Sequence, residues 1–297
     1  MNHAAAADAS PDDVFAANAH KVLTAVVVGS IGAGKTSLCR RLKALGDGSN
    51  PAFAGLHVIV VPEPVDTWSS CGALENFLSA PGRYAAMFQH MAFNSRIQLW
   101  VKTWRTAVAD AVADPAISIV LVVLERSPKC DRLLFADQMY DDGIFTNEEY
   151  ELYKLWFDYC NALAPSPVDL YIDVHTPFDE TIARIEARAN ADPTRAAEKK
   201  YDPAYLRRSY DRQRRIFDER LYGEDAPILH VDGMQPFHVD AGVVHAIMTR
   251  IQAAGRRASL KRSADTTPRT PSPTPLGDEF AAFVRTEICR CRACLAS

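Results

Sequence analysis

Apolar residues gather in five short runs separated by longer stretches of mixed character. The runs are rich in Val, Ile and Leu, and their length is typical of strands buried on both faces of a sheet. They are Val22–Val28, Leu56–Val61, Ile117–Leu124, Leu170–Val174 and Ile228–Val231. Because none approaches the length that crosses a bilayer, we expect a soluble protein.

In the intervening stretches, apolar residues recur every three to four positions, which predicts amphipathic helices. The predicted helices are Lys35–Leu45, Arg83–Val112, Asn147–Leu163, Phe178–Asn190, Pro203–Tyr222 and Val239–Ala253. Strands that alternate with helices predict the α/β class, here a five-stranded parallel sheet flanked by helices.

The two ends of the chain differ in composition from the middle. Residues 1–21 are rich in alanine, and residues 255–297 are rich in Arg, Ser, Thr and Pro, so we expect disordered ends around a catalytic domain at 22–254. Residues 1–21 also lack the arginines of a mitochondrial presequence. The tail carries motifs that protein kinases phosphorylate, at Ser259 and at the residues before four prolines. It also carries a loose prenylation motif at Cys294. Its cysteines offer a metal site as an alternative, but a fourth ligand is missing.

Charge and cysteine usage narrow the range of partners. The chain has 33 basic and 37 acidic residues, a net charge of −4, and no stripe of one sign that would select nucleic acid or an anionic membrane. Its seven cysteines form no paired framework, which favours a reducing compartment, the cytoplasm. We therefore expect small-molecule partners, no nucleic acid and no stable membrane association.

A phosphate-binding motif follows the first predicted strand. Gly29 to Thr36 fits G-x-x-x-x-G-K-[ST] and leads directly into a predicted helix, which is the context of a P-loop. Such a loop points backbone N–H groups at phosphate, while its lysine reaches the β- and γ-oxygens and its hydroxyl ligates Mg²⁺. The residues predicted to hold a nucleoside triphosphate are Gly29, Ser30, Gly32, Ala33, Gly34, Lys35, Thr36 and Ser37. The alternative is a glycine turn with an incidental lysine.

Acidic residues follow the second and third predicted strands. Glu63 begins Glu-Pro-Val-Asp-Thr-Trp, and Glu125 begins Glu-Arg-Ser. The carboxyl ends of parallel strands are where α/β folds bind ligands. Glu63 is therefore a candidate base that deprotonates a hydroxyl acceptor, and Glu125 a candidate partner of Thr36 in holding magnesium. Taken singly, each has a plainer explanation as a solvated charge or an ion pair.

Together these motifs resemble the deoxyribonucleoside kinases of the deoxycytidine/deoxyguanosine kinase type. The resemblance rests on the loop at Gly29, EPVDTW at Glu63 to Trp68, Phe88-Gln89, Glu125-Arg126-Ser127 and the arginines between 184 and 195. It extends over roughly residues 22 to 235. It implies a P-loop NTPase fold with an arginine-rich lid. The implied activity is ATP- and Mg²⁺-dependent phosphorylation of a deoxyribonucleoside 5′-hydroxyl in nucleotide salvage, by a homodimer.

The resemblance also implies roles for individual residues around the acceptor. Glu63 is the base, Arg126 steadies the 5′-oxygen and the phosphoryl group, and Lys35 completes the catalytic set. The nucleobase would contact Trp68, Phe88, Gln89 and Phe135. Arg96 and Asp131 occupy positions that correlate with base preference, and they favour deoxycytidine or a purine deoxynucleoside over thymidine. An ordinary surface salt bridge between them is the alternative.

In the lid, Arg184 and Arg188 lie four apart on one helix face. By resemblance, Arg188 and Arg195 bind the triphosphate, and Glu198, with Asp192 as competitor, binds the sugar 3′-hydroxyl. Leu78 stands where relatives carry a tyrosine that contacts the same hydroxyl. Asp232 follows the last strand, where relatives wrap around the adenine of the donor.

Two other functions share the P-loop. A nucleoside monophosphate kinase of the thymidylate type uses similar loop and lid logic, but a carboxylate at Glu63 would repel an incoming monophosphate. A nucleotide-dependent switch is the second, although the chain lacks the guanine motif N-K-x-D of the GTPases.

Overall fold

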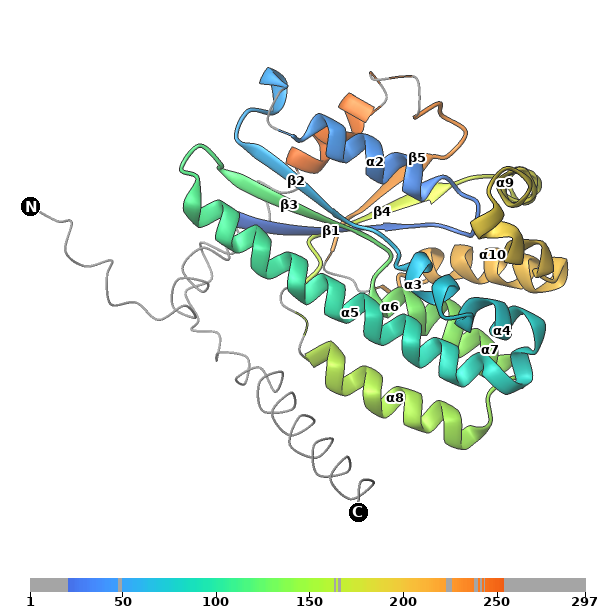
Figure 1. Ribbon diagram of the computed structural model, residues 1–297. Helices are drawn as coiled ribbons and strands as arrows, with labels where there is room; N and C mark the ends of the chain where they lie inside the picture. The colour runs from blue at the N-terminus through green and yellow to red at the C-terminus, as the bar shows by residue number, and fades with distance from the viewer. Residues whose placement is uncertain are drawn as a thin grey trace, which may run out of the picture. The chain divides into compact units, whose positions relative to one another are not determined.

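The computed structural model describes residues 21–47, 50–162, 164, 167–222, 226–237, 240, 242 and 244–253. The chain divides into two units, residues 1–264 and 265–297, of which the second lies outside the described residues. The first contains a five-stranded sheet of order β2-β3-β1-β4-β5, in which every pairing is parallel (Figure 1). Its strands are β1 (Val22–Val28), β2 (Leu56–Val61), β3 (Ile119–Glu125), β4 (Leu170–His175) and β5 (Ile228–Asp232). The predicted α/β fold is confirmed, although β3 begins two residues later than predicted.

The register of the sheet brings three loops to one edge. Val27 of β1 pairs with Glu125 of β3, and Val28 of β1 pairs with Asp173 of β4. The loop after β1 therefore begins beside the end of β3. Since β2 pairs with β3 up to Val61, the segment after β2 reaches the same edge.

Most helices lie where the sequence pattern predicts them. They are α2 (Lys35–Leu45), α3 (Val65–Ser70), α4 (Ala73–Ser79), α5 (Pro81–Ala113), α6 (Pro128–Cys130), α7 (Asp137–Asp141), α8 (Asn147–Ala162), α9 (Phe178–Ala191) and α10 (Pro203–Asp218). Short 3₁₀ segments occur at η2 (Pro51–Phe53) and η4 (Pro193–Lys200), and η3 (Asp131–Ala136) is a π-helix. Residues 244–253 are helical within the predicted Val239–Ala253.

One predicted helix ends early, and four short helices were not predicted. The helix predicted to continue to Tyr222 ends at Asp218, and Arg220 beyond it adopts a left-handed φ of 52°. The short helices α3, α4, α6 and α7 were not predicted, because three to seven residues show too little periodicity to separate a helix from a loop.

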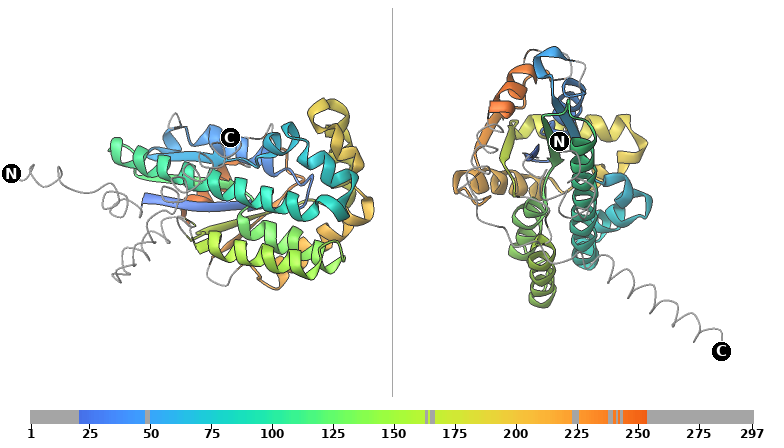
Figure 2. Two further views of the ribbon diagram at one scale, coloured as in Figure 1. Left: turned by 60° about the horizontal axis from the view of Figure 1, so that its bottom comes forward. Right: turned by 90° about the vertical axis from the view of Figure 1, so that its left-hand side faces the viewer.

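Helices cover both faces of the sheet (Figures 1 and 2), and each face carries its own apolar core. Side chains alternate along a strand, so Val26 of β1 enters one core and Val27 the other. The larger core packs under α5 and α8, and the smaller one under α2 and residues 244–253. Burial on both faces explains why the strands read as unbroken apolar runs.

A third, small cluster lies under the lid, which we define as α9, η4 and the start of α10. Ile185, Tyr205 and Leu206 form it, and Ile31 of the phosphate loop packs against it. Within the described residues no helix is long and apolar enough to cross a membrane. The predictions for residues 1–20 and for the tail, including Ser259 and Cys294, lie outside the described residues.

Candidate active site

The phosphate loop joins β1 to α2 as a tight, glycine-shaped cradle. Gly32 has a φ of 83°, and a Cβ there would lie 2.4 Å from the carbonyl oxygen of Thr181 on α9. Gly34, with a φ of 97°, is the N-cap of α2. Glycine adopts such angles more readily than any residue with a Cβ. The first N–H groups of α2 therefore point into a cradle that suits a phosphate group.

Lys35 folds across this cradle. Its Nζ donates to the carbonyl oxygen of Ser30 at 2.8 Å, and its side chain is buried. Burial, together with the positive charge of Arg126, lowers the pKa of Lys35 to about 7. A bound polyphosphate would stabilise the charged form, so Lys35 is suited to contact phosphate oxygens.

A hydroxyl and a carboxylate meet next to Lys35. Thr36 Oγ1 donates to Glu125 Oε1 at 2.6 Å, across the junction of α2 and β3. The described residues contain no group of three or more His, Cys, Asp or Glu side chains that could hold a metal. Magnesium at phosphate sites needs only one or two protein oxygens, because phosphate and water complete its octahedron. Thr36 and Glu125 therefore fit magnesium bound together with a nucleotide.

Glu63 connects the acceptor side to the phosphate loop through arginines. Its Oε1 accepts from Arg126 Nη1 at 3.1 Å and from Arg96 Nη2. Arg126 Nη2 also donates to the carbonyl oxygen of Gly29 at 3.0 Å. Arg126 holds a left-handed φ of 65°, a strained conformation that clusters at functional sites.

The charge of Glu63 is fixed by these neighbours. Burial alone would raise the pKa of Glu63, but the cations of Arg126, Arg96 and Lys35 outweigh burial and hold that pKa below its usual range. Glu63 is therefore ionised throughout the physiological pH range.

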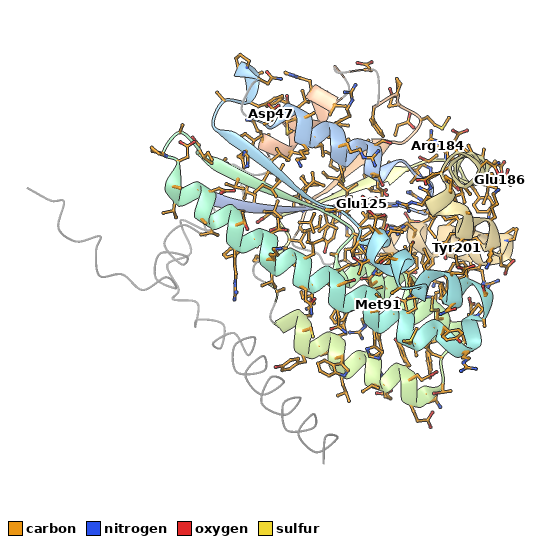
Figure 3. The ribbon with its side chains drawn as sticks, viewed as in Figure 1. Asp47, Met91, Glu125, Arg184, Glu186 and Tyr201 are labelled. Atoms are coloured by element: carbon orange, nitrogen blue, oxygen red, sulfur yellow. The ribbon has the colours of Figure 1, made fainter. Side chains whose placement is uncertain are left out.

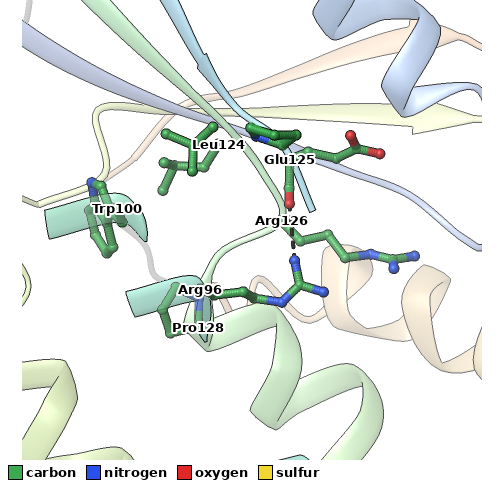
Figure 4. Close-up of a pocket in the computed structure, with 8 residues that line it drawn as sticks. Arg96, Trp100, Leu124, Glu125, Arg126 and Pro128 are labelled. Atoms are coloured by element: carbon green, nitrogen blue, oxygen red, sulfur yellow. Dashed lines mark hydrogen bonds between the residues drawn. The ribbon is translucent and has the colours of Figure 1, made fainter. Parts of the chain in front are cut away.

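Arg96 and Asp131 form a buried pair, not a surface salt bridge. Their side chains are 5 % and 1 % exposed. Arg96 Nε donates to Asp131 Oδ1 at 2.9 Å, and Arg96 Nη1 donates to the Glu125 carbonyl at 3.2 Å, the dashed bond in Figure 4. Asp131 Oδ2 receives no aligned hydrogen bond from the described residues.

Burial raises the pKa of Asp131 to about 6 despite the positive charge of Arg96. Asp131 opens the π-helix η3, an irregularity frequent at functional sites.

Aromatic rings enclose the same region. Arg96 lies 5.0 Å above the ring of Trp68, and Arg126 lies 4.9 Å above that of Phe135. Phe88 contacts Trp68 edge to face at 5.5 Å. Gln89 is buried, and its Oε1 has no hydrogen-bond partner among the described residues. An apolar wall with one open amide suits a flat heterocycle.

The charged side chains of the lid form two separate groups. Glu198 is buried and pairs with Arg188 Nη2 at 2.7 Å and with Arg195 Nη1 at 3.2 Å. Arg184 instead pairs with Glu180 at 2.8 Å and donates to the carbonyl of Gly233 at 3.0 Å. The common helix face of Arg184 and Arg188 thus does not lead to a common partner.

Three further residues lie in a turn, in the larger core and beside the lid. Asp232 closes the turn after β5, because its oxygens accept from Met234 N at 2.9 Å and from Gln235 Nε2 at 3.2 Å. Leu78 packs against the larger core. Tyr201, directly after η4, packs against the small cluster under the lid, and no sequence motif marks it.

Comparisons with known proteins agree with this geometry. The family model described as deoxynucleoside kinase matches residues 25–254. A probable deoxycytidine kinase of Fowlpox virus is 24 % identical over 233 residues, covering 78 % of this chain and 87 % of the relative. Deoxycytidine kinase of Rattus norvegicus is 24 % identical over 230 residues, covering 69 % and 82 %. The resemblance noted in the motifs is confirmed, and the chain belongs to the deoxynucleoside kinase family, whose phosphate donor is a nucleotide.

Proposed function

We propose that this kinase transfers the γ-phosphate of ATP to the 5′-hydroxyl of deoxycytidine or a purine deoxynucleoside, in preference to thymidine. The observation that carries the proposal is the arginine bridge: Arg126 bonds both Glu63 and the Gly29 carbonyl of the phosphate loop. A hydroxyl held by Glu63 is therefore next to the cradle where a γ-phosphate would lie. Deoxycytidine kinases among the relatives support the choice of acceptor.

Glu63 accepts the proton of the 5′-hydroxyl in this scheme. Its lowered pKa makes it a weak base, but phosphoryl transfer has a loose transition state in which positioning contributes more than proton abstraction. Arg126 holds the carboxylate in place. Arg126 Nε is buried and makes no hydrogen bond to the described residues, so it is available to the transferring phosphoryl group.

Cationic side chains around the phosphate loop neutralise the negative charge of the triphosphate. Lys35 reaches the β- and γ-phosphate oxygens, and Arg188 and Arg195 approach them from the lid once Glu198 engages the substrate. Thr36 and Glu125 would hold Mg²⁺, which supplies further charge neutralisation at those oxygens when bound. Asp232 is assigned to the edge of the adenine site.

Base preference follows from Asp131 and Gln89. The ionised Asp131, oriented by Arg96, accepts from the exocyclic amino group of cytosine or a purine, whereas thymine would present a carbonyl oxygen to it. The free amide oxygen of Gln89 accepts a second base N–H. Trp68, Phe88 and Phe135 pack around the ring.

The test is a panel of acceptors with ATP and Mg²⁺, followed by detection of the phosphorylated product. We expect dCMP, dAMP or dGMP to form faster than TMP. Production of TMP alone would overturn the base assignment. Phosphorylation of a nucleoside monophosphate, or ATP hydrolysis without an acceptor, would favour the two rival functions.

We further propose a cytoplasmic homodimer that acts in nucleotide salvage. Cysteines 39, 71, 130 and 160 are free, as in a reducing compartment. Helix α8 exposes an apolar stripe of Leu152, Leu155, Trp156 and Tyr159, spaced as a helix interface requires. Leu155→Glu should convert a dimer to a monomer in light scattering, whereas Leu221→Glu, at another exposed leucine, should not. A wild-type monomer would contradict the dimer.

A further inference from the structure

The middle segment of the lid, η4, has no apolar anchor. Among its described side chains only Glu198 is buried, and no residue of η4 belongs to any of the three apolar clusters. The position of η4 therefore depends on polar contacts. Segments with few buried apolar contacts open at little cost in free energy, and the lids of enzymes are drawn from such segments.

Lys200, the last residue of η4, makes polar contacts with α4. Its Nζ donates to Glu75 Oε1 at 2.9 Å and to Ser79 Oγ at 3.0 Å. Among the described residues, no other hydrogen bond or ion pair joins η4 to α4. Figure 3 shows Tyr201, the residue after Lys200, at the same end of the molecule as Arg184 of α9. We refer to Lys200, Glu75 and Ser79 as the lid bridge.

The other face of α4 belongs to the aromatic wall of the acceptor region. Glu75 and Ser79 lie four residues apart on one exposed face, whereas Phe77 between them is buried. Phe77 stacks on Phe88 with ring centroids 4.8 Å apart, and Phe88 in turn contacts Trp68. Helix α4 therefore contacts the lid with one face and the acceptor wall with the other.

On the lid, the bridge lies next to the charges assigned to the substrates. Glu198 is two residues before Lys200 and pairs with Arg188 at 2.7 Å and with Arg195 at 3.2 Å. Tyr201 N donates to the Glu198 carbonyl at 3.2 Å, so a backbone turn links Glu198 to the residue after Lys200. A displacement of Lys200 should therefore move Glu198 and both of its arginines.

The lid bridge is exposed and can open. The side chains of Lys200 and Glu75 are 44 % and 63 % exposed. Such an ion pair adds little to the stability of the fold, and added salt weakens it. A weak contact suits a lid, because the lid has to close and reopen in every catalytic cycle.

We propose that Lys200 is a positioning residue that ties the lid to α4 and thereby couples acceptor binding to lid closure. With the bridge in place, the lid is held next to an acceptor wall that is already formed. Without it, acceptor binding has to supply the free energy of closing the lid, which raises the KM for the acceptor. The inference rests on the proposed deoxynucleoside kinase function and adds to it a connection between the lid and the acceptor side.

The test is a charge swap, measured as the KM for the deoxynucleoside at saturating ATP. Lys200→Glu places two acids together and should raise this KM about two- to fivefold, the value of an exposed ion pair, without lowering kcat. Lys200→Glu combined with Glu75→Lys forms the pair again in the opposite sense and should restore the wild-type KM. A fall in kcat at unchanged KM would overturn the proposal.

Salt provides a second test of the same variants. The deoxynucleoside is uncharged, so the difference in its KM between wild type and Lys200→Glu should come from the bridge. This difference should shrink at about 1 M salt, where the Debye length is about 3 Å. A difference that does not depend on salt would overturn an electrostatic role of Lys200.

Lys199→Glu is the matched control. Lys199 is exposed and adjacent to Lys200 but takes no part in the bridge. The variant makes the same change in the charge of the lid and should keep the wild-type KM. An equal rise of KM in Lys199→Glu and Lys200→Glu, or a charge swap that does not restore KM, would overturn the bridge.

Amide hydrogen exchange of residues 194–201 tests the bridge without any substrate. Exchange should be about two- to fivefold faster in Lys200→Glu and should return to the wild-type rate in the charge swap. Unchanged exchange would overturn the bridge, whether or not the protein phosphorylates a deoxynucleoside. A wild-type enzyme that phosphorylates no deoxynucleoside would overturn the proposed function instead, so the two failures are distinguishable.

Discussion

The phosphate loop and the acceptor network recognise their ligands by different means. The loop is contiguous, residues 29–36, and its shape comes from glycine backbone angles. The acceptor network consists of side chains from four separate segments: Glu63 after β2, Arg96 on α5, Arg126 after β3 and Asp131 in η3. A substitution in the loop should therefore act through sterics. A substitution in the network should act through charge.

Arg126 joins the two regions, because it bonds Glu63 and the Gly29 carbonyl. The effects of substitutions in the phosphate loop and in the acceptor network are therefore not fully additive at Arg126. At other positions, a substitution should affect only one of the two regions.

The largest effect is expected at Glu63. Glu63→Gln removes the base and its charge, and should lower kcat about 10²- to 10⁴-fold. ATP binding, measured by calorimetry, should change little because the cradle is intact. Asp66→Asn, at an exposed acid of the same segment, should keep wild-type activity. A Glu63→Gln enzyme with normal turnover would remove Glu63 as the base.

The next largest effect concerns base choice. Asp131→Asn replaces an ionised acceptor with a neutral amide that can also donate to a carbonyl. The ratio of kcat/KM for thymidine to that for deoxycytidine should rise about ten- to hundredfold, the value of a hydrogen bond to a charged group. If the ratio stays constant, the buried Arg96–Asp131 pair has only a structural role.

A steric change in the loop should have a smaller but distinct effect. Gly32→Ala and Gly143→Ala both place a side chain at positive φ, 83° and 68°, but only the first meets a neighbour, the Thr181 oxygen at 2.4 Å. Gly32→Ala should cost about 1 to 3 kcal/mol more stability than Gly143→Ala, and only Gly32→Ala should weaken ATP binding. Chemical denaturation and calorimetry measure both. Equal costs would show that the loop can relax.

The smallest effect is a pH dependence confined to the acceptor side. Burial raises the pKa of Asp131 to about 6, with Arg96 and Arg126 opposing and Glu63 adding to the rise. Below pH 6 Asp131 gains a proton and stops accepting from the base. The preference for deoxycytidine over thymidine should then fall by up to about tenfold per pH unit, while Asp131→Asn should show a flat profile.

Protonation of Asp131 should lower base preference, but it should raise the stability of the folded state. The folded-state pKa of Asp131 lies above the value of about 3.9 expected in the unfolded chain. Protonation between about pH 6 and pH 4 therefore favours the folded state at this residue. A loss of base preference in that range is not explained by unfolding through Asp131, and thermal melts at each pH check this.

The sheet and the phosphate loop could be predicted from the amino-acid pattern alone. Burial on both faces requires unbroken apolar strands, so β1 was evident with its bounds. The loop requires glycines at fixed spacing from Lys35, a constraint written within eight residues. Both are local rules, and local rules can be read from a single chain.

The pairing of the charged side chains could not be predicted in this way. Glu63 and Arg126 were evident as strand-end residues, but their bond joins positions 63 apart in the chain. The separation of Arg184 from Arg188, the π-helix at Asp131 and the place of Tyr201 beneath the lid depend on how distant segments pack. Because a side chain's partner is set by packing and not by its neighbours in sequence, these features needed the folded protein.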